Sequence, residues 1–133
     1  MKQFDIRTNS NFAMIDITAR VRTFLKETRI KSGICYVFIP HTTAAVTINE
    51  NADPDVPKDI ITILDKLIPL NDHYRHMEGN AAAHVKSSLL GSSQMVFIEN
   101  GDLVLGTWQS IFFCEFDGPR TRKVYVKLVP TAT

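Results

Sequence analysis

Hydrophobic positions follow two different periods along this chain, which predicts a mixture of strands and helices. Residues 2–8 place Phe4 and Ile6 between polar neighbours, the period of two that a half-buried strand shows. Over residues 16–28 the apolar positions recur at helical spacing, with basic residues on the other face, which predicts a helix. The run 34–39 is β-branched and aromatic without interruption, and this composition is typical of a central strand.

The rest of the chain continues the mixed pattern. Asn100-Gly101 lies between two apolar runs, and this dipeptide is a strong signal for a hairpin turn. The further expected elements are a strand over 44–49, helices over 53–67 and 80–91, and strands over 93–99, 103–105, 107–116 and 123–129. About seven strands, mostly antiparallel, with about three helices predict an α+β fold built on a sheet or sandwich.

Composition narrows the class of protein. A chain of 133 residues has the size of one domain, so we expect a single domain over 1–133. No apolar run reaches the ~20 residues of a membrane span, and the N-terminus lacks the apolar segment of a signal peptide, so we expect a cytoplasmic protein without membrane contact. The net charge of +1 argues against a nucleic-acid partner. Cys35 and Cys114 lie in apolar runs, which predicts buried free thiols.

Three of the four histidines fall where functional groups are expected. His41 follows a predicted strand, His76 lies in the polar loop 71–79, and His84 lies on the following helix. Together with Glu50 or Glu78 they offer the nitrogen and oxygen donors of a zinc-like site. Because no two of them share one helix face at metal-binding spacing, structural or solvated roles remain an alternative for each.

Other polar residues near these histidines are candidates for substrate binding. Thr42 and Thr43 offer hydroxyl groups to an anion, and Glu50 or Asp53 can accept a proton or hold Mg²⁺, although Asp53 before a proline is also a typical helix cap. Arg120 belongs to a basic cluster with Arg122 and Lys123, which is either a phosphate-binding fringe or a charged edge strand.

Three positions near the C-terminal strands complete the candidate set. Trp108 is the only tryptophan and, beside Gln109, is placed to stack on a ligand ring or to fill a core or interface. Glu115 interrupts an apolar strand, so it either reaches solvent, faces a site, or meets a partner such as Arg120 or Arg122.

Taken in order, these motifs resemble those of one family. The blocks are His41-Thr42-Thr43-Ala44-Ala45, Asn49-Glu50, Asp53-Pro54, Tyr74-Arg75-His76, His84 with Lys86 to Gly91, and Leu105-Gly106-Thr107-Trp108-Gln109 with Glu115. They resemble the YjbQ-like family, also called the secondary thiamine-phosphate synthase family, over nearly the whole chain. His73 lies outside the shared pattern, and Asn80-Ala81-Ala82-Ala83 stands where many relatives carry an acidic residue.

The resemblance implies a small α+β fold, a homotrimer, and weak thiamine-phosphate synthase activity. Such an enzyme joins a pyrimidine methyl diphosphate to a thiazole phosphate and releases pyrophosphate, which calls for a divalent metal ion, Zn or Mg, and fixed cationic donors. The alternatives are a metal-dependent hydrolase of a small phosphorylated or ester substrate and a non-enzymatic trimer that binds a metal or an anion. The expected catalytic residues are His41, Glu50, His76 and His84, the metal ligands His41, His76 and His84, and the substrate-binding residues Thr42, Thr43, Trp108, Gln109, Glu115 and Arg120.

Overall fold

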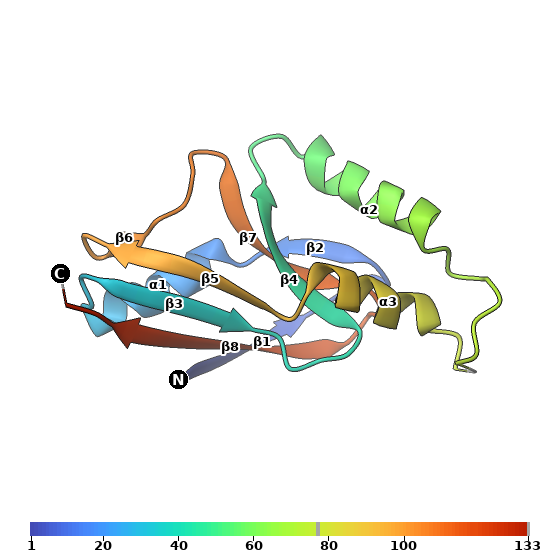
Figure 1. Cartoon of the computed structure of the whole chain (residues 1–133), viewed down its shortest axis with the longest axis horizontal. Coiled ribbons are helices and arrows are strands. Elements are labelled where there is room, and N and C mark those ends of the chain that lie inside the picture. Colours follow the sequence, from blue (N-terminus) through green and yellow to red (C-terminus); the bar gives the residue numbers. More distant parts are fainter. Residues whose placement is uncertain (77, 133) are drawn as a thin grey trace.

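The protein consists of two antiparallel sheets and three helices, and this confirms the predicted α+β class (Figure 1). The structure is a computed structural model, and it describes residues 1–76 and 78–132. Within these residues none of the helices is long and apolar enough to cross a membrane.

The larger sheet has five strands in the order β1-β8-β3-β5-β6, with every neighbouring pair antiparallel. Their bounds are β1 Lys2–Arg7, β3 Gly33–Phe38, β5 Ser93–Glu99, β6 Asp102–Leu103 and β8 Thr121–Pro130. β8 lies between β1 and β3, so the interpretation of its basic cluster as a charged edge strand is wrong. The N-terminal strand covers that edge, because Phe4 and Ile6 pair with Val124 and Arg122 of β8.

The smaller sheet has three strands in the order β2-β7-β4. Their bounds are β2 Ala13–Asp16, β7 Gln109–Glu115 and β4 Ala44–Glu50. β2 makes the total eight strands among the described residues, one more than the seven predicted. Its sequence Ala-Met-Ile-Asp shows no alternation of apolar and polar residues and lies one residue before the first helix, so it was not predicted as a separate element.

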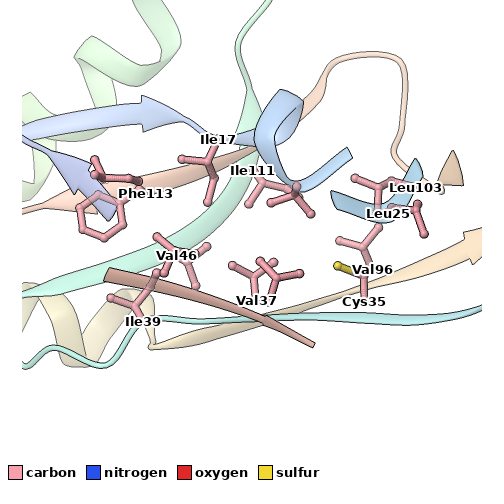
Figure 2. Packing of buried hydrophobic residues seen from close by; sticks show 14 of the residues in the cluster. Ile17, Leu25, Cys35, Val37, Ile39, Val46, Val96, Leu103, Ile111 and Phe113 are labelled. Atoms are coloured by element: carbon pink, nitrogen blue, oxygen red, sulfur yellow. The ribbon is translucent and has the colours of Figure 1, made fainter. Parts of the chain in front are cut away.

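The main hydrophobic core fills the space between the two sheets. Figure 2 shows Val37 of β3 and Val46 of β4 pointing into the same interior as Ile111 and Phe113 of β7. All four are fully buried, and each such side chain stabilises the fold by roughly 1.5–3 kcal/mol through removal from water.

β3 is central in the sheet, as predicted, but only one of its faces is buried. Cys35 and Val37 point into the core, whereas Tyr36 and Phe38 are 44% and 45% exposed on the outer face. The unbroken apolar run of β3 therefore belongs to a strand with one face in the core and one apolar face exposed to solvent.

The three helices are α1 Thr18–Thr28, α2 Asp55–Leu67 and α3 Ala81–Leu90, close to the ranges predicted. α2 and α3 lie at the end of the molecule away from the C-terminus (Figure 1). α3 packs against β4, and its buried Lys86 bonds to Asp65 of α2 while its ammonium lies 4.3 Å from the centre of the Phe12 ring. This contact fixes α2 to α3, and α3 carries His84.

Both cysteines are buried free thiols, as predicted. Burial raises the pKa of Cys35 to about 11 and that of Cys114 to about 12, so both are protonated at neutral pH. Because the thiolate is the reactive form, neither residue offers a nucleophile to a functional site.

Candidate functional site

His41 occupies the corner between β3 and β4, where Pro40 ends one strand and Ala44 begins the next. The backbone N–H of Lys123 in β8 donates a 2.9 Å hydrogen bond to His41 Nε2. Partial burial and the nearby Arg122 charge both lower the pKa of His41, which favours the neutral ring. Since Nε2 accepts a hydrogen bond, the proton of that neutral ring lies on Nδ1.

A buried ion pair lies beneath this corner. Arg122 Nε donates 2.9 Å and 3.1 Å hydrogen bonds to the two Glu115 oxygens, and Nη2 donates to Glu115 and, at 2.9 Å, to Thr43 Oγ1. Thr8 Oγ1 donates to the same carboxylate at 2.7 Å, and so does the Asp117 N–H at 3.1 Å. Glu115 is fully buried, and of the two partners anticipated for it, Arg120 and Arg122, the structure has Arg122.

These contacts set the charge of the pair. Burial by itself would raise the pKa of Glu115, but the hydrogen bonds from Arg122, Thr8 and the Asp117 backbone outweigh it and lower the pKa. The pair is therefore ionised at neutral pH, with Arg122 held in one orientation. The Nη1 atom of Arg122 has no protein hydrogen-bond partner among the described residues. Arg122 also lines an open hollow above the ion pair.

An open polar hollow of about 630 Å³ lies over this pair. It brings together residues from the β3–β4 corner, the start of α3 and the β7–β8 turn, which are far apart in sequence. The lining comprises Phe38, Ile39, Pro40, His41, Thr42, Thr43, Glu78, Asn80, His84, Ser92, Asp117, Arg120 and Arg122. Five predicted site residues, namely His41, Thr42, Thr43, His84 and Arg120, therefore share one cavity.

His76 lies beside this hollow and contacts His84. The two rings meet edge to face with their centres 5.0 Å apart, and His76 Nε2 lies 2.8 Å from Asn80 Oδ1. Asn80 in turn donates a 2.9 Å hydrogen bond to Asp117, which also pairs with Arg120. A polar chain thus connects the loop before α3 to the turn before β8.

Glu50, Trp108 and Gln109 lie at the other end of the smaller sheet. Glu50 pairs with Gln109 at one end of the β4–β7 ladder, whereas Ala44 pairs with Glu115 at the other. Six residues of strand separate the two ends by about 20 Å. Within one chain these three residues therefore cannot touch a ligand in the hollow, and any part they take in it would have to come from another copy.

A metal ion bound by His41, His76 and His84 requires their ring nitrogens to point toward one centre. Across residues 1–76 and 78–132, no three His, Cys, Asp or Glu side chains are placed together to hold a metal ion. His41 uses its Nε2 for the Lys123 N–H, and His76 Nε2 faces Asn80. The three rings as they lie do not form a ligand set, so a histidine-bound ion stays a prediction.

Arg122 was expected only as an alternative to Arg120 for the partner of Glu115, yet it is the residue that forms the buried ion pair. A signal was present, because Arg122 has the same strand phase as Val124 and Val126, both of which point into the core. A charged side chain in the buried phase of a strand needs a fixed partner. Asp117 and Ser92 had no such signal, since their place in the hollow depends on how turns meet in space.

Comparison with known proteins identifies close relatives. A family model described as UPF0047 protein YjbQ-like matches residues 2–131. UPF0047 protein YugU of Bacillus subtilis is 56% identical over 130 residues, which covers 97% of this chain and 98% of that protein. UPF0047 protein MJ1081 of Methanocaldococcus jannaschii is 51% identical over 127 residues, which covers 96% of this chain and 92% of the relative.

Solved structures show the same fold. An uncharacterized conserved protein of the YjbQ/UPF0047 family from Clostridium acetobutylicum is 53% identical with a TM-score of 0.95, over 97% of this chain and 100% of that one. A YbjQ-like protein of unknown function from Sulfolobus solfataricus is 33% identical with a TM-score of 0.94, over 98% and 96% of the two chains. The similarity extends over the whole domain.

The ion pair generates a prediction about acid stability. Because the folded state lowers the pKa of Glu115, its stabilisation is fully present above the unfolded value of about 4.3 and is lost as pH falls through the lower folded value. We expect Glu115→Gln to lower the free energy of unfolding by about 3 kcal/mol at pH 7, since it leaves Arg122 buried without its counter-charge.

Urea denaturation between pH 7 and pH 3 measures this difference, which should shrink toward the acid end. Glu99→Gln, at an exposed position on β5, is the matched control and should change stability by less than about 0.5 kcal/mol. A Glu115→Gln variant as stable as the wild type at pH 7 would contradict the role assigned to the pair.

Proposed function

Because this chain belongs to the UPF0047 (YjbQ-like) family, we propose that the hollow binds the diphosphate of a small substrate and that the protein is a thiamine-phosphate synthase-like enzyme. The proposed reaction joins a pyrimidine methyl diphosphate to a thiazole phosphate and releases pyrophosphate. One observation carries the proposal: two hydrogen-bond donors held in place by other contacts, Arg122 Nη1 and His41 Nδ1–H, belong to side chains that line the same open hollow.

The chemistry of this reaction matches such a hollow. The C–O bond between the pyrimidine methylene and the diphosphate breaks, and its electron pair leaves on the pyrophosphate oxygen. The thiazole nitrogen supplies the electron pair of the new C–N bond. Negative charge on the departing oxygens therefore grows in the transition state, and donors fixed in advance stabilise it without reorganisation.

Arg122, His41 and Arg120 have different roles in the proposed reaction. Arg122 is held by Glu115 and Thr43, so it offers a permanent positive charge whose orientation costs nothing at the moment of reaction. His41 adds a neutral N–H donor, because its other nitrogen is occupied by the Lys123 N–H. Arg120, 53% exposed at the rim, attracts the anion from solvent.

Activity of histidine variants tests the synthase proposal. We expect His41→Ala to lower the rate of thiamine phosphate formation at least about tenfold, because it removes the N–H donor proposed for the leaving pyrophosphate. His73→Ala is the matched control, because His73 is an exposed loop histidine that does not line the hollow. Chromatographic detection of thiamine phosphate gives the rate, and equal rates for both variants would contradict the proposal.

A second candidate is hydrolysis of the phosphorylated substrate. The observation that favours it is the pair of imidazoles at 5.0 Å, with the Glu78 carboxylate 3.8 Å from His76 Nε2, because such groups can accept a proton from an attacking water. Omitting the thiazole acceptor from the same assay separates the candidates. A hydrolase releases pyrophosphate as fast without the acceptor as with it, and a non-enzymatic binding protein releases none in either case.

A divalent ion enters this proposal together with the substrate. Mg²⁺ is commonly held by one or two carboxylates and by substrate phosphates, and Glu78 and Asp117 line the hollow. Such an ion would supply further positive charge to the leaving pyrophosphate. The arrangement requires no preformed set of three histidines.

Metal content and affinity test this arrangement. We expect purified protein to contain little metal by elemental analysis and to bind pyrophosphate more tightly in the presence of Mg²⁺, with Asp117→Asn abolishing the Mg²⁺ effect. Asp72→Asn, at an exposed loop position outside the hollow, is the control. One zinc ion per chain, lost in His84→Ala, would instead support the three-histidine site.

The homotrimer is also part of the proposal, and the outer face of the larger sheet supports it. Tyr36, Phe38, Met95 and Phe97 lie side by side on β3 and β5, each between 44% and 56% exposed. With Val129 they present on the order of 450 Å² of apolar surface, about half of the ~800 Å² that each partner contributes to a standard interface. Phe38 also lines the hollow, so a second copy on this face reaches its rim.

Light scattering on the eluting protein tests the assembly. We expect a mass three times that of the 15.0 kDa chain, and a smaller mass for Phe97→Glu, which places a charge on the apolar face. Leu89→Glu, on the exposed side of α3, is the control and should leave the mass unchanged. A monomeric wild-type protein would exclude the trimer.

A further inference from the structure

A groove of about 350 Å³ adjoins the hollow at the imidazole pair. The loop before α3 and the first half of α3 form this groove. His84 lines both spaces, so a ligand in the groove and a ligand in the hollow can both contact it. The lining of the groove comprises Tyr74, Arg75, His76, Ala81, His84 and Val85.

The walls of the groove are flat and mostly apolar. Three of its six lining residues carry rings, and Ala81 and Val85 add methyl groups from α3. These walls are open to solvent, since Val85 is 46% exposed and the His76 side chain 40%. The Tyr74 hydroxyl donates to the Pro69 carbonyl oxygen, which holds the ring in place. Such walls suit a planar heteroaromatic ring, which stacks on other rings and packs against methyl groups.

Arg75 adds a permanent positive charge to this lining. Its side chain is exposed, and it has no carboxylate partner among the described residues, whereas Arg120 and Arg122 each pair with one. The groove itself has no carboxylate in its lining, because Glu78, which lies 3.8 Å from His76 Nε2, lines the hollow instead. An unpaired guanidinium binds a phosphate group well, since its N–H groups match the spacing of two phosphate oxygens.

We propose that the groove is the acceptor subsite and binds a planar heteroaromatic ring that carries one phosphate, with the ring against Tyr74 and the phosphate on Arg75. In the proposed reaction this molecule is the thiazole phosphate, so the inference deepens the proposed function and rests on it for the identity of the ligand. The donor diphosphate lies on Arg122, and the two substrates meet at His84. There the thiazole nitrogen supplies the electron pair of the new C–N bond, and pyrophosphate leaves with the pair of the broken C–O bond.

This subsite gives the stacking role expected of Trp108 to other side chains. Trp108 lies at the opposite end of the smaller sheet from the hollow and cannot reach it within one chain. Phe38 does line the hollow, but it belongs to the apolar face proposed as the trimer contact. The ring side chains of the groove are therefore the ones that lie beside the hollow and remain available to a ligand.

Four probes separate the groove from the hollow. The alcohol 5-(2-hydroxyethyl)-4-methylthiazole and its phosphate report on the groove, inorganic pyrophosphate reports on the hollow, and 4-amino-5-hydroxymethyl-2-methylpyrimidine reports on the donor ring. Binding to the full chain is measured by calorimetry and, for weak ligands, by ligand-observed NMR. The variants are Arg75→Gln, Tyr74→Leu and Tyr74→Phe, and the matched control is Arg7→Gln, at an exposed position on β1 that lines neither space.

We expect the wild type to bind the thiazole phosphate about five- to tenfold more tightly than the thiazole alcohol, and Arg75→Gln to lose this preference, because it removes a charge-assisted hydrogen bond. Tyr74→Leu should weaken binding of both thiazoles about two- to tenfold through loss of the ring contact, whereas Tyr74→Phe keeps the ring and the affinity. Neither Arg75→Gln nor Arg7→Gln should change the pyrophosphate Kd. Arg75 is exposed, so its substitution tests the subsite even where Tyr74→Leu disturbs the loop.

Three results would overturn the acceptor subsite. The first is failure of the wild type to bind the thiazole phosphate, and the second is an Arg75→Gln variant that keeps the full preference for the phosphate. The third is loss of pyrimidine affinity in Tyr74→Leu while thiazole affinity is unchanged, which would assign the groove to the donor ring.

Failure of the proposed function gives a different pattern. In that case pyrophosphate does not bind and no thiamine phosphate forms, while binding of the thiazole phosphate still depends on Arg75 and on the ring at position 74. That pattern supports the groove as a site for a phosphorylated heteroaromatic compound and removes the hollow from the mechanism.

Discussion

The ion pair between Arg122 and Glu115 joins the two sheets at the end where the hollow opens. Arg122 belongs to the five-stranded sheet and Glu115 to the three-stranded sheet, and Thr43 ties the β3–β4 corner to the same guanidinium. Buried ion pairs add little stability compared with well-packed apolar side chains, because desolvation offsets their attraction. Their contribution here is position, since the pair sets where the corner and the β7–β8 turn lie.

The positions of the other site residues depend on this ion pair. Because β8 is fixed against the corner, the Lys123 N–H reaches His41 and determines which ring nitrogen carries the proton. Asp117, two residues after Glu115, then links Arg120 to Asn80 at the start of α3. The helix that bears His84 is thus oriented by polar contacts that begin at the same carboxylate, and the hollow and the groove meet at that histidine.

Local pattern was enough to predict most elements, because each helix and strand of five or more residues repeats its period at least twice. It missed β2, because its sequence Ala-Met-Ile-Asp places three apolar residues in succession and shows no alternation. The apolar run of β3 predicted its central place but not which of its faces are covered, since such a run is equally consistent with burial on both faces and with one apolar face left open. Tyr36 and Phe38 show the second case.

The sequence by itself determined the fold class and the family resemblance and made His41 and His84 candidate site residues, because these depend on residue type and on spacing along the chain. Only the tertiary structure decided that these two share a hollow with Arg122, and that Glu50 and Trp108 lie about 20 Å away along the strands. The reason is physical: which residues lie close together across the two sheets depends on the strand order and on how the buried charges pair. Neither is a property of any short segment.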